Sequence, residues 1–271
     1  MGAQPQVLIL HATGTNRDRE AARACELAGA KPDIRLLSDL TDGTIRLADY
    51  QMLLLPGGFS FGDDLGAGKL WALRLHSRIG DQLRTFVDDG WPVLGICNGF
   101  QALVKAGLLP GALPVEGAHV SDALFGPAHA TLTRNASARF ECRWVHLQPN
   151  PTSPSIFVQG LGEELIYCPV AHGEGRFVAR DERTLSAIED ANLVALRYVT
   201  ATGGTPSYPA DPNGSDHHIA GVCNAAGNVM GLMPHPEDHI TARQHPGYHR
   251  GQRGGLGLRL FEAGVRYAAQ R

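Results

Sequence analysis

Short runs of consecutive aliphatic residues, separated by stretches with helical periodicity, constrain the fold of this chain more than any other feature. Helices are expected near 17–29 and 69–89 and directly after residue 97, and they alternate with the apolar runs VLIL (7–10), DIRLL (33–37), MLLLPGG (52–58) and PVLGI (92–96). Strands that are apolar along their length are typical of parallel sheets covered by helices on both faces. We therefore predict an α/β fold with a doubly wound, mostly parallel sheet and flanking helices.

Beyond about residue 125 the pattern becomes rich in β-structure. We expect strands in AHATLT, RFECRWVHL, SIFVQG, LIYCPVA, LVALRYV and the pair within IAGVCNAAGNVMGLM, and we expect them to extend the same sheet. The Pro-, Gly- and Ser-rich stretch 201–216 predicts a long loop within the domain. The final stretch GLGLRLFEAGVRYAAQ predicts an amphipathic helix.

Composition and charge exclude several classes of protein. A chain of 271 residues that are 43% hydrophobic is long enough to bury a sizeable core. The net charge of -3, with no concentration of Lys and Arg, argues against a nucleic-acid partner. The start MGAQPQVLILHATG has no basic leader and an apolar run too short for a signal peptide or a membrane span. We expect a cytoplasmic protein that binds neither nucleic acid nor membrane.

The five cysteines are odd in number, widely spaced and without a CxxC pair, which argues against a disulfide framework and a thiolate zinc site. A lone cysteine is most often a small buried apolar residue. We interpret four of them in this way: Cys25, Cys142, Cys168 and Cys223.

Cys97 stands in a different context, between a predicted buried strand and a predicted helix. The pattern Gly95-Ile96-Cys97-Asn98-Gly99 is a nucleophile elbow with Cys in place of Ser, in which the flanking glycines allow a sharp turn. The start of the helix would favour the thiolate form. A nucleophile is the favoured interpretation, and a buried structural cysteine is the alternative.

The segment GLMPHPEDH supplies a candidate base. His235 and Glu237 flank Pro236 at the end of an apolar run, and residues i and i+2 of an extended chain project to the same side. Glu237 can then orient the imidazole, as in a catalytic triad. The alternative is a polar loop after a strand. A helical metal site from His235, Glu237 and His239 is excluded, because Pro236 would lie inside the helix.

The third apolar run leads into GGFSFGDDLGAG. Gly57 and Gly58 allow backbone N–H groups to approach a ligand closely, as an oxyanion hole requires, and a tight turn is the alternative. A phosphate loop in GDDLGAGKL is a poor match, since Asp63 stands where that motif needs glycine and Leu70 where it needs Ser or Thr.

Six segments, in this order, resemble the glutamine amidotransferase subunits and domains of phosphoribosylformylglycinamidine synthase: GGFSFGD, GICNGFQ, NASARFEC, HGEG, PNGS and GNVMGLMPHPE. The resemblance runs from about residue 7 to about residue 240. GICNGFQ and PHPE are typical of triad glutaminases in general, whereas GGFSFGD, RFEC and HGEG favour this family. It implies a flavodoxin-like class I glutamine amidotransferase fold, formed by residues 1–271 as one domain with a C-terminal extension after about 240.

The resemblance also implies roles for particular residues. Cys97 would attack glutamine, His235 would act as base and then acid, and Glu237 would orient His235. The backbone N–H groups of Gly58 and Asn98 would form the oxyanion hole. Further contacts with the substrate would come from Gln101, His172, Gly173 and Glu174.

The implied activity is hydrolysis of L-glutamine through a cysteinyl thioester, with no cofactor or metal in this chain. The ammonia would pass to a separate synthetase that uses ATP and Mg to convert formylglycinamide ribonucleotide to formylglycinamidine ribonucleotide in purine biosynthesis, with a small third subunit. Phe61 and Asp238 depart from the Tyr and Arg usual in the family. A generic cysteine hydrolase of similar fold and a catalytically silent binding subunit are the alternatives.

Overall fold

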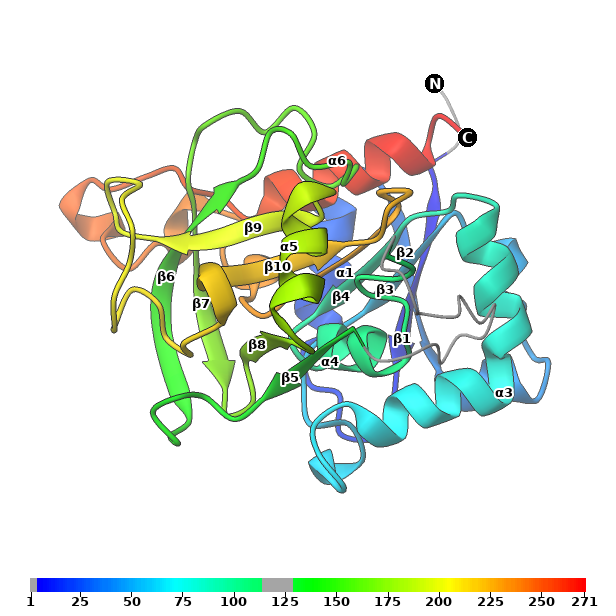
Figure 1. Cartoon of the computed structure of the whole chain (residues 1–271). Helices are drawn as coiled ribbons and strands as arrows, with labels where there is room; N and C mark the ends of the chain where they lie inside the picture. Colours follow the sequence, from blue (N-terminus) through cyan, green and yellow to red (C-terminus); the bar gives the residue numbers. More distant parts are fainter. Residues whose placement is uncertain (1–3, 114–128) are drawn as a thin grey trace.

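The computed structural model describes residues 4–113 and 129–271, and its central element is a nine-stranded sheet in the order β2-β1-β3-β4-β11-β10-β9-β6-β7 (Figure 1). The first five of these strands pair in parallel: β2 (Lys31–Leu36), β1 (Gln6–His11), β3 (Met52–Leu55), β4 (Val93–Ile96) and β11 (Val229–Leu232). The other four continue the sheet antiparallel: β10 (Ile219–Cys223), β9 (Val194–Val199), β6 (Glu141–Pro149) and β7 (Ile166–His172).

Helices cover both faces of the parallel half. On one face α1 (Asp18–Leu27) contacts α6 (Leu258–Ala268), and on the other α3 (Lys69–Asp88) contacts α4 (Asn98–Lys105) (Figure 1). Two further helices are α2 (Leu37–Thr41) and α5 (Glu182–Asp190). The short 3-10 turns are η1 (Leu47–Asp49), η2 (Ser60–Asp63), η3 (Asp216–His218), η4 (Pro236–Asp238), η5 (Ala242–Gln244) and η6 (Tyr248–Arg250). No helix in the described ranges is both long and apolar enough to cross a membrane.

The predicted strands and helices of the parallel half are confirmed, as is the C-terminal helix; the loop predicted over 201–216 is also present and ends at residue 215, directly before η3. The predicted strand in SIFVQG is wrong, because residues 156–160 form turns that bury Ile156, Phe157 and Val158 without pairing. The prediction that every later strand extends the same sheet is also wrong, since β5 (Ala130–Thr133) pairs with β8 (Arg176–Ala179) in a separate two-stranded sheet. Residue 128, the first of AHATLT, lies outside the described residues.

The apolar runs form the buried centre of the molecule. All four residues of β3 and the three apolar residues of β4 are fully buried, as expected of strands that are covered on both faces. The neighbouring strands β3, β4 and β11 run parallel, so their carboxyl ends reach the same edge of the sheet. The segments that follow them, which hold Gly57, Cys97 and His235, therefore meet at that edge.

Candidate active site

Cys97 occupies a strained turn between β4 and α4. Its φ of 50° and ψ of −104° are unusual for a residue other than glycine, a conformation that costs on the order of 1–3 kcal/mol. The surrounding structure holds it: the Cys97 N–H donates to the carbonyl of Leu232 on β11 at 2.8 Å. Two residues on, α4 touches β3, and a Cβ added to Gly99 would lie 2.0 Å from the Leu55 carbonyl oxygen. The elbow predicted from the sequence is thus present.

His235 and Glu237 form a buried pair. Their Nδ1 and Oε1 atoms lie 2.7 Å apart, and the exposed fractions of the two residues are only 3% and 0%. The route to this contact differs from the predicted one, because Pro236–Asp238 is a turn of 3-10 helix rather than extended chain. Only His235 keeps the non-helical conformation that a residue before proline prefers, with ψ 84°.

The imidazole of His235 connects this pair to Cys97. Burial disfavours its protonated form, but the Glu237 carboxylate and a hydrogen-bonded Cys97 sulfur outweigh burial and hold the pKa of His235 well above its usual value. The ring lies against the main chain at Gly57, where an added Cβ would be 2.6 Å from the His235 Cε1 atom. The structure therefore brings together all three residues of the predicted triad.

Two backbone N–H groups near Cys97 have no acceptor within the described chain, those of Gly58 and Asn98. The N–H of Asn98 is free because it lies in the first turn of α4. Gly58 is held in place by its neighbours, since Phe59 N–H donates to the Gly14 carbonyl and Gly58 forms an isolated bridge with Thr15. Both donors predicted for the oxyanion hole are thus available.

Cys97 opens into a pocket of about 200 Å³. Its walls come from the segment after β3, the start of α4, Phe140 and the HGEG segment at the end of β7. The residues that line it are Gly58, Phe59, Asp63, Ala67, Cys97, Gln101, Phe140, Ala171, His172, Gly173 and Glu174. Of the residues predicted to contact substrate, Gln101, His172, Gly173 and Glu174 all lie in this wall.

Gln101 has both ends of its amide engaged by protein groups. Its Nε2 donates to the Glu174 carbonyl at 2.7 Å, and its Oε1 accepts from Asn98 Nδ2 at 2.9 Å. Asn98 Nδ2 also donates to Asp63, and Asn98 Oδ1 accepts from the N–H of Ser60. The side chains of Gln101 and Asn98 therefore tie the three walls of the pocket to one another.

Two carboxylates line this pocket, Glu174, which was predicted to contact substrate, and Asp63, which was not. Glu174 Oε2 accepts from the N–H of Ala67 at 3.1 Å, while Asp63 accepts from Asn98. Burial, followed by repulsion from Glu174, raises the pKa of Asp63 to about 6. Asp63 ends the motif GGFSFGD, which is the sequence signal that could have identified it.

His172 is buried and neutral. Burial, followed by nearby His235, lowers its pKa to about 3. Its Nδ1 bonds Asn135 Oδ1 at 3.1 Å, and its buried Nε2 has no partner among the described residues. Asn135 and Asn213 also hold the backbone of Gly175, through its N–H and its carbonyl respectively. These two asparagines, from NASARFEC and PNGS, support the HGEG segment, a role that sequence reasoning missed.

Comparison with known proteins places the chain in a family. Residues 4–268 match the model of the CobB/CobQ-like glutamine amidotransferase domain. The PurQ subunit of phosphoribosylformylglycinamidine synthase from Treponema denticola is 44% identical, over 97% of this chain and 99% of that protein. The chain belongs to the PurQ family. The PurQ subunit from Dehalococcoides mccartyi is 40% identical, with 98% of both chains covered.

The fold agrees with that of two solved structures from Thermotoga maritima. A chain in the structure of PurLQS from Thermotoga maritima superposes with a TM-score of 0.71 at 32% identity, over 98% of this chain and 99% of that one. A glutamine amidotransferase from the same organism shares the fold at 15% identity, with a TM-score of 0.52. The predicted flavodoxin-like class I glutamine amidotransferase fold is confirmed.

Both departures from the usual PurQ pattern have local partners. Asp238 lies 3.5 Å from Arg17 Nε, and Phe61 lies under the guanidinium of Arg74 at 4.8 Å from the ring centroid. Cys97 takes part in neither of these two contacts. No group of three His, Cys, Asp or Glu residues within 4–113 and 129–271 is placed to hold a metal ion.

One cysteine prediction is wrong. Cys25, Cys168 and Cys223 are buried as expected, whereas Cys142 is exposed on β6. Its side chain projects from the sheet on the side opposite to buried Glu141 and Val145, because successive residues of a strand alternate between faces.

Proposed function

We propose that this chain hydrolyses L-glutamine to glutamate and ammonia through a cysteinyl thioester, as the glutaminase subunit of a phosphoribosylformylglycinamidine synthase. The observation that carries the proposal is the arrangement around one small pocket. Cys97 lies beside a histidine that Glu237 orients, Gly58 lines the same pocket, Asn98 follows Cys97 directly, and the N–H groups of Gly58 and Asn98 have no acceptor in the described chain. A nucleophile, an oriented base and oxyanion donors are the groups that acyl transfer requires.

The reaction proceeds in two steps. The Cys97 thiolate attacks the side-chain amide carbon of glutamine, and the N–H groups of Gly58 and Asn98 stabilise the resulting oxyanion. His235 donates a proton to the leaving nitrogen, so that ammonia departs and a γ-glutamyl thioester remains. His235 then takes a proton from water, the hydroxide attacks the thioester, and glutamate and the Cys97 thiol are released. Glu237 stabilises the charged imidazole in both steps.

The pocket also suggests how glutamine is recognised. Its α-ammonium group carries a positive charge, and we propose that Asp63 and Glu174 together hold it. Both carboxylates line the pocket, and their mutual repulsion is relieved when a cation lies between them. Gln101, His172 and Gly173 shape the wall rather than carry charge, because the Gln101 amide is already bonded to protein and His172 is neutral.

The proposed partner is a separate synthetase that uses ATP and Mg to convert formylglycinamide ribonucleotide to formylglycinamidine ribonucleotide, with a small third subunit. The matching Thermotoga maritima chain comes from a structure of PurLQS, which supports such an assembly. Phe59 and Phe140 line the pocket and are 45% and 54% exposed, so apolar surface surrounds its mouth. Such a surface is suited to docking a partner that receives the ammonia.

We further propose that residues 1–271 form a single domain and that the protein is cytoplasmic. The residues after about 240 form an extension that ends in α6; α6 packs on β3 and α1, and its Leu260, Phe261 and Val265 are buried. One continuous group of buried apolar residues includes these three side chains together with those of the sheet. The extension thereby belongs to the same core.

A glutamine-mimicking electrophile is expected to label Cys97 and no other cysteine. Burial raises the pKa of Cys25 to about 12 and that of Cys168 well above its usual value, so these thiols stay protonated and unreactive. Peptide mapping by mass spectrometry identifies the labelled residue. Exposed Cys142 is the internal control, and Cys142→Ser should leave labelling intact. Labelling at Cys142 with Cys97 untouched would reject the proposed nucleophile. If a generic thiol reagent labelled Cys97 as fast as the glutamine mimic does, the pocket would not be selective for glutamine, which would favour a hydrolase of another substrate.

The pH dependence of kcat/KM should report the titration of Asp63. Its pKa of about 6 means that the carboxyl is ionised above pH 6 and gains a proton below it, which removes one charge from the ammonium site. We therefore expect kcat/KM for glutamine to fall as the pH drops through about 6, through a rise in KM. In Asp63→Asn the KM should be high at every pH and this acidic limb should disappear. Asp64→Asn, an exposed neighbour, is the matched control, and an unchanged limb in Asp63→Asn would exclude Asp63 from binding the ammonium group.

A further inference from the structure

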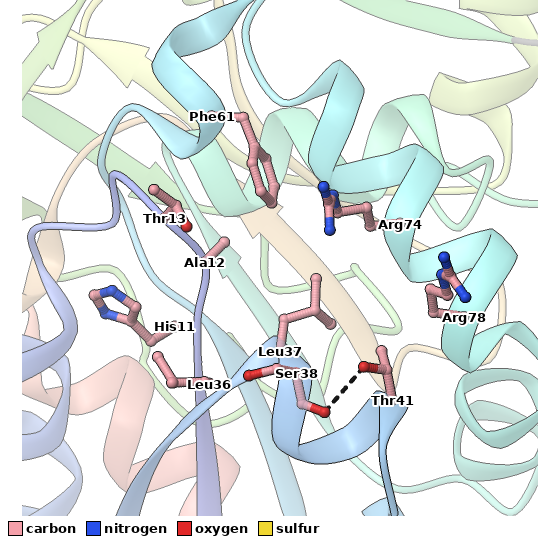
Figure 2. A pocket seen from close by; sticks show the side chains of 10 residues that line it. All are labelled: His11, Ala12, Thr13, Leu36, Leu37, Ser38, Thr41, Phe61, Arg74 and Arg78. Atoms are coloured by element: carbon pink, nitrogen blue, oxygen red, sulfur yellow. Dashed lines mark hydrogen bonds between the residues drawn. The ribbon is translucent and has the colours of Figure 1, made fainter.

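A second pocket, of about 400 Å³, lies at the carboxyl ends of β1 and β2, apart from the pocket of Cys97 (Figure 2). Ala12 and Thr13 follow β1, Leu37 and Ser38 follow β2, and Phe61 lies in the segment after β3. Since α1 and α3 cover opposite faces of the sheet, the chain leaves β1 and β3 in opposite directions. Open α/β sheets bind ligands in the crevice that such a change of direction creates.

Two arginines from α3 line this pocket, Arg74 and Arg78. They are four residues apart and so lie on one side of the helix, where like charges repel. Arg74 lies over the ring of Phe61, and Figure 2 shows its guanidinium turned toward that ring. Within the described chain neither arginine has a carboxylate partner, whereas Arg17, Arg23 and Arg46 elsewhere in the molecule each pair with a carboxylate.

Hydroxyl groups lie across the pocket from these arginines. The Ser38 and Thr13 hydroxyls have no hydrogen-bond partner in the described chain, whereas Thr41 donates to the carbonyl of Ser38. His11 completes the lining, with its Nδ1 bonded to Asp18 at 2.8 Å. The pocket therefore offers two positive charges and two free hydroxyl donors, with apolar walls from Leu37 and Phe61.

We propose that this pocket binds the phosphate group of a small phosphomonoester. Arginine binds phosphate through paired N–H donors. A phosphomonoester carries about two negative charges at neutral pH, which balance the two guanidinium charges, whereas a carboxylate carries only one. A volume of about 400 Å³ exceeds what one phosphate ion fills and lies within the range of small-molecule sites. The organic part of the ester packs between Leu37 and Phe61.

Isothermal titration calorimetry at low ionic strength, with ribose 5-phosphate and with inorganic phosphate, tests the proposal. The full-length chain should bind ribose 5-phosphate saturably and more tightly than inorganic phosphate. The double variant Arg74→Gln/Arg78→Gln should bind it about tenfold or more weakly, since it loses both charge-assisted contacts. Arg84→Gln, on the same helix but outside the pocket, should bind like the unaltered protein.

Two results would overturn the proposal. Equal affinity of the double variant and the unaltered chain for ribose 5-phosphate would exclude the two arginines as its site. Equal affinity of the unaltered chain for inorganic phosphate and the ester would exclude an organic phosphomonoester as the ligand. Thermal unfolding and glutaminase activity of the double variant show whether it is folded, and neither should change, because Arg74 and Arg78 lie outside the pocket of Cys97.

Discussion

The Cys97→Ala variant is expected to lose glutamine hydrolysis almost completely, by about 10⁴-fold or more in kcat, because none of the other described residues that line the pocket carries a thiol to form the thioester. The same variant should leave ammonia-dependent synthesis of formylglycinamidine ribonucleotide nearly unchanged. In a reconstituted mixture with the matching synthetase, ATP and Mg, both activities are measured in parallel with either glutamine or an ammonium salt as the nitrogen source.

The comparison of the two nitrogen sources distinguishes a loss of glutamine hydrolysis from a loss of binding to the synthetase. If the variant still docks on the synthetase, ammonia rescues the product and only the glutamine-dependent rate falls. Cys142→Ala is the matched control, since Cys142 is exposed and outside the pocket, and it should retain both activities. Equal loss of both activities in Cys97→Ala, with the complex still formed, would mean that this chain does something other than supply ammonia.

Glu237→Gln is expected to lower kcat by about 10³- to 10⁴-fold with little change in the KM for glutamine. The carboxylate accepts a hydrogen bond from His235 Nδ1 at 2.7 Å and is fully buried. An amide can instead donate to that nitrogen, which fixes the wrong tautomer of the imidazole, and it no longer stabilises the protonated ring. Steady-state kinetics of glutaminase activity with the synthetase present measure both parameters.

Asp238→Asn is the control for this variant. It makes the same chemical change one residue away, where the carboxylate faces Arg17 rather than His235. We expect it to keep most of the turnover of the unaltered enzyme. Full turnover in Glu237→Gln would remove Glu237 from the catalytic machinery and leave Cys97 and His235 as a dyad.

The parallel half of the fold could be predicted from the sequence because each of its central strands is apolar on both faces. The same rule failed at Ile156, Phe157 and Val158, where an equally apolar run is buried as a turn against the core. Burial alone does not distinguish a paired strand from a packed turn. The strand β8 and the helix α5 also went unpredicted, since only long-range pairing with β5 fixes β8 as a strand.

Some residues of the candidate site could likewise be predicted from local sequence signals, and others could not. Cys97, His235 and Glu237 could be predicted because each stands at the end of a recognisable strand, within a few residues of its signal. Asn135 and Asn213 could not, because they act on Gly175 across 40 and 38 residues of chain, and no local pattern encodes such a contact. The acidic pair could not be recognised for a similar reason, since Asp63 and Glu174 are distant in sequence and meet only in the folded pocket.

The contact between Gly99 and β3 has a consequence for how this lineage can diverge. A side chain at position 99 would collide with the main-chain carbonyl of Leu55, which cannot rotate away as a side chain does. The collision would push β3 and the Gly57 and Gly58 that follow it, so the penalty falls on folding as well as on turnover. A descendant that has stopped hydrolysing glutamine is free to replace Cys97, but we expect it to retain glycine at position 99. A glycine at position 99 would therefore indicate shared ancestry, whereas a cysteine at position 97 would indicate retained glutaminase activity.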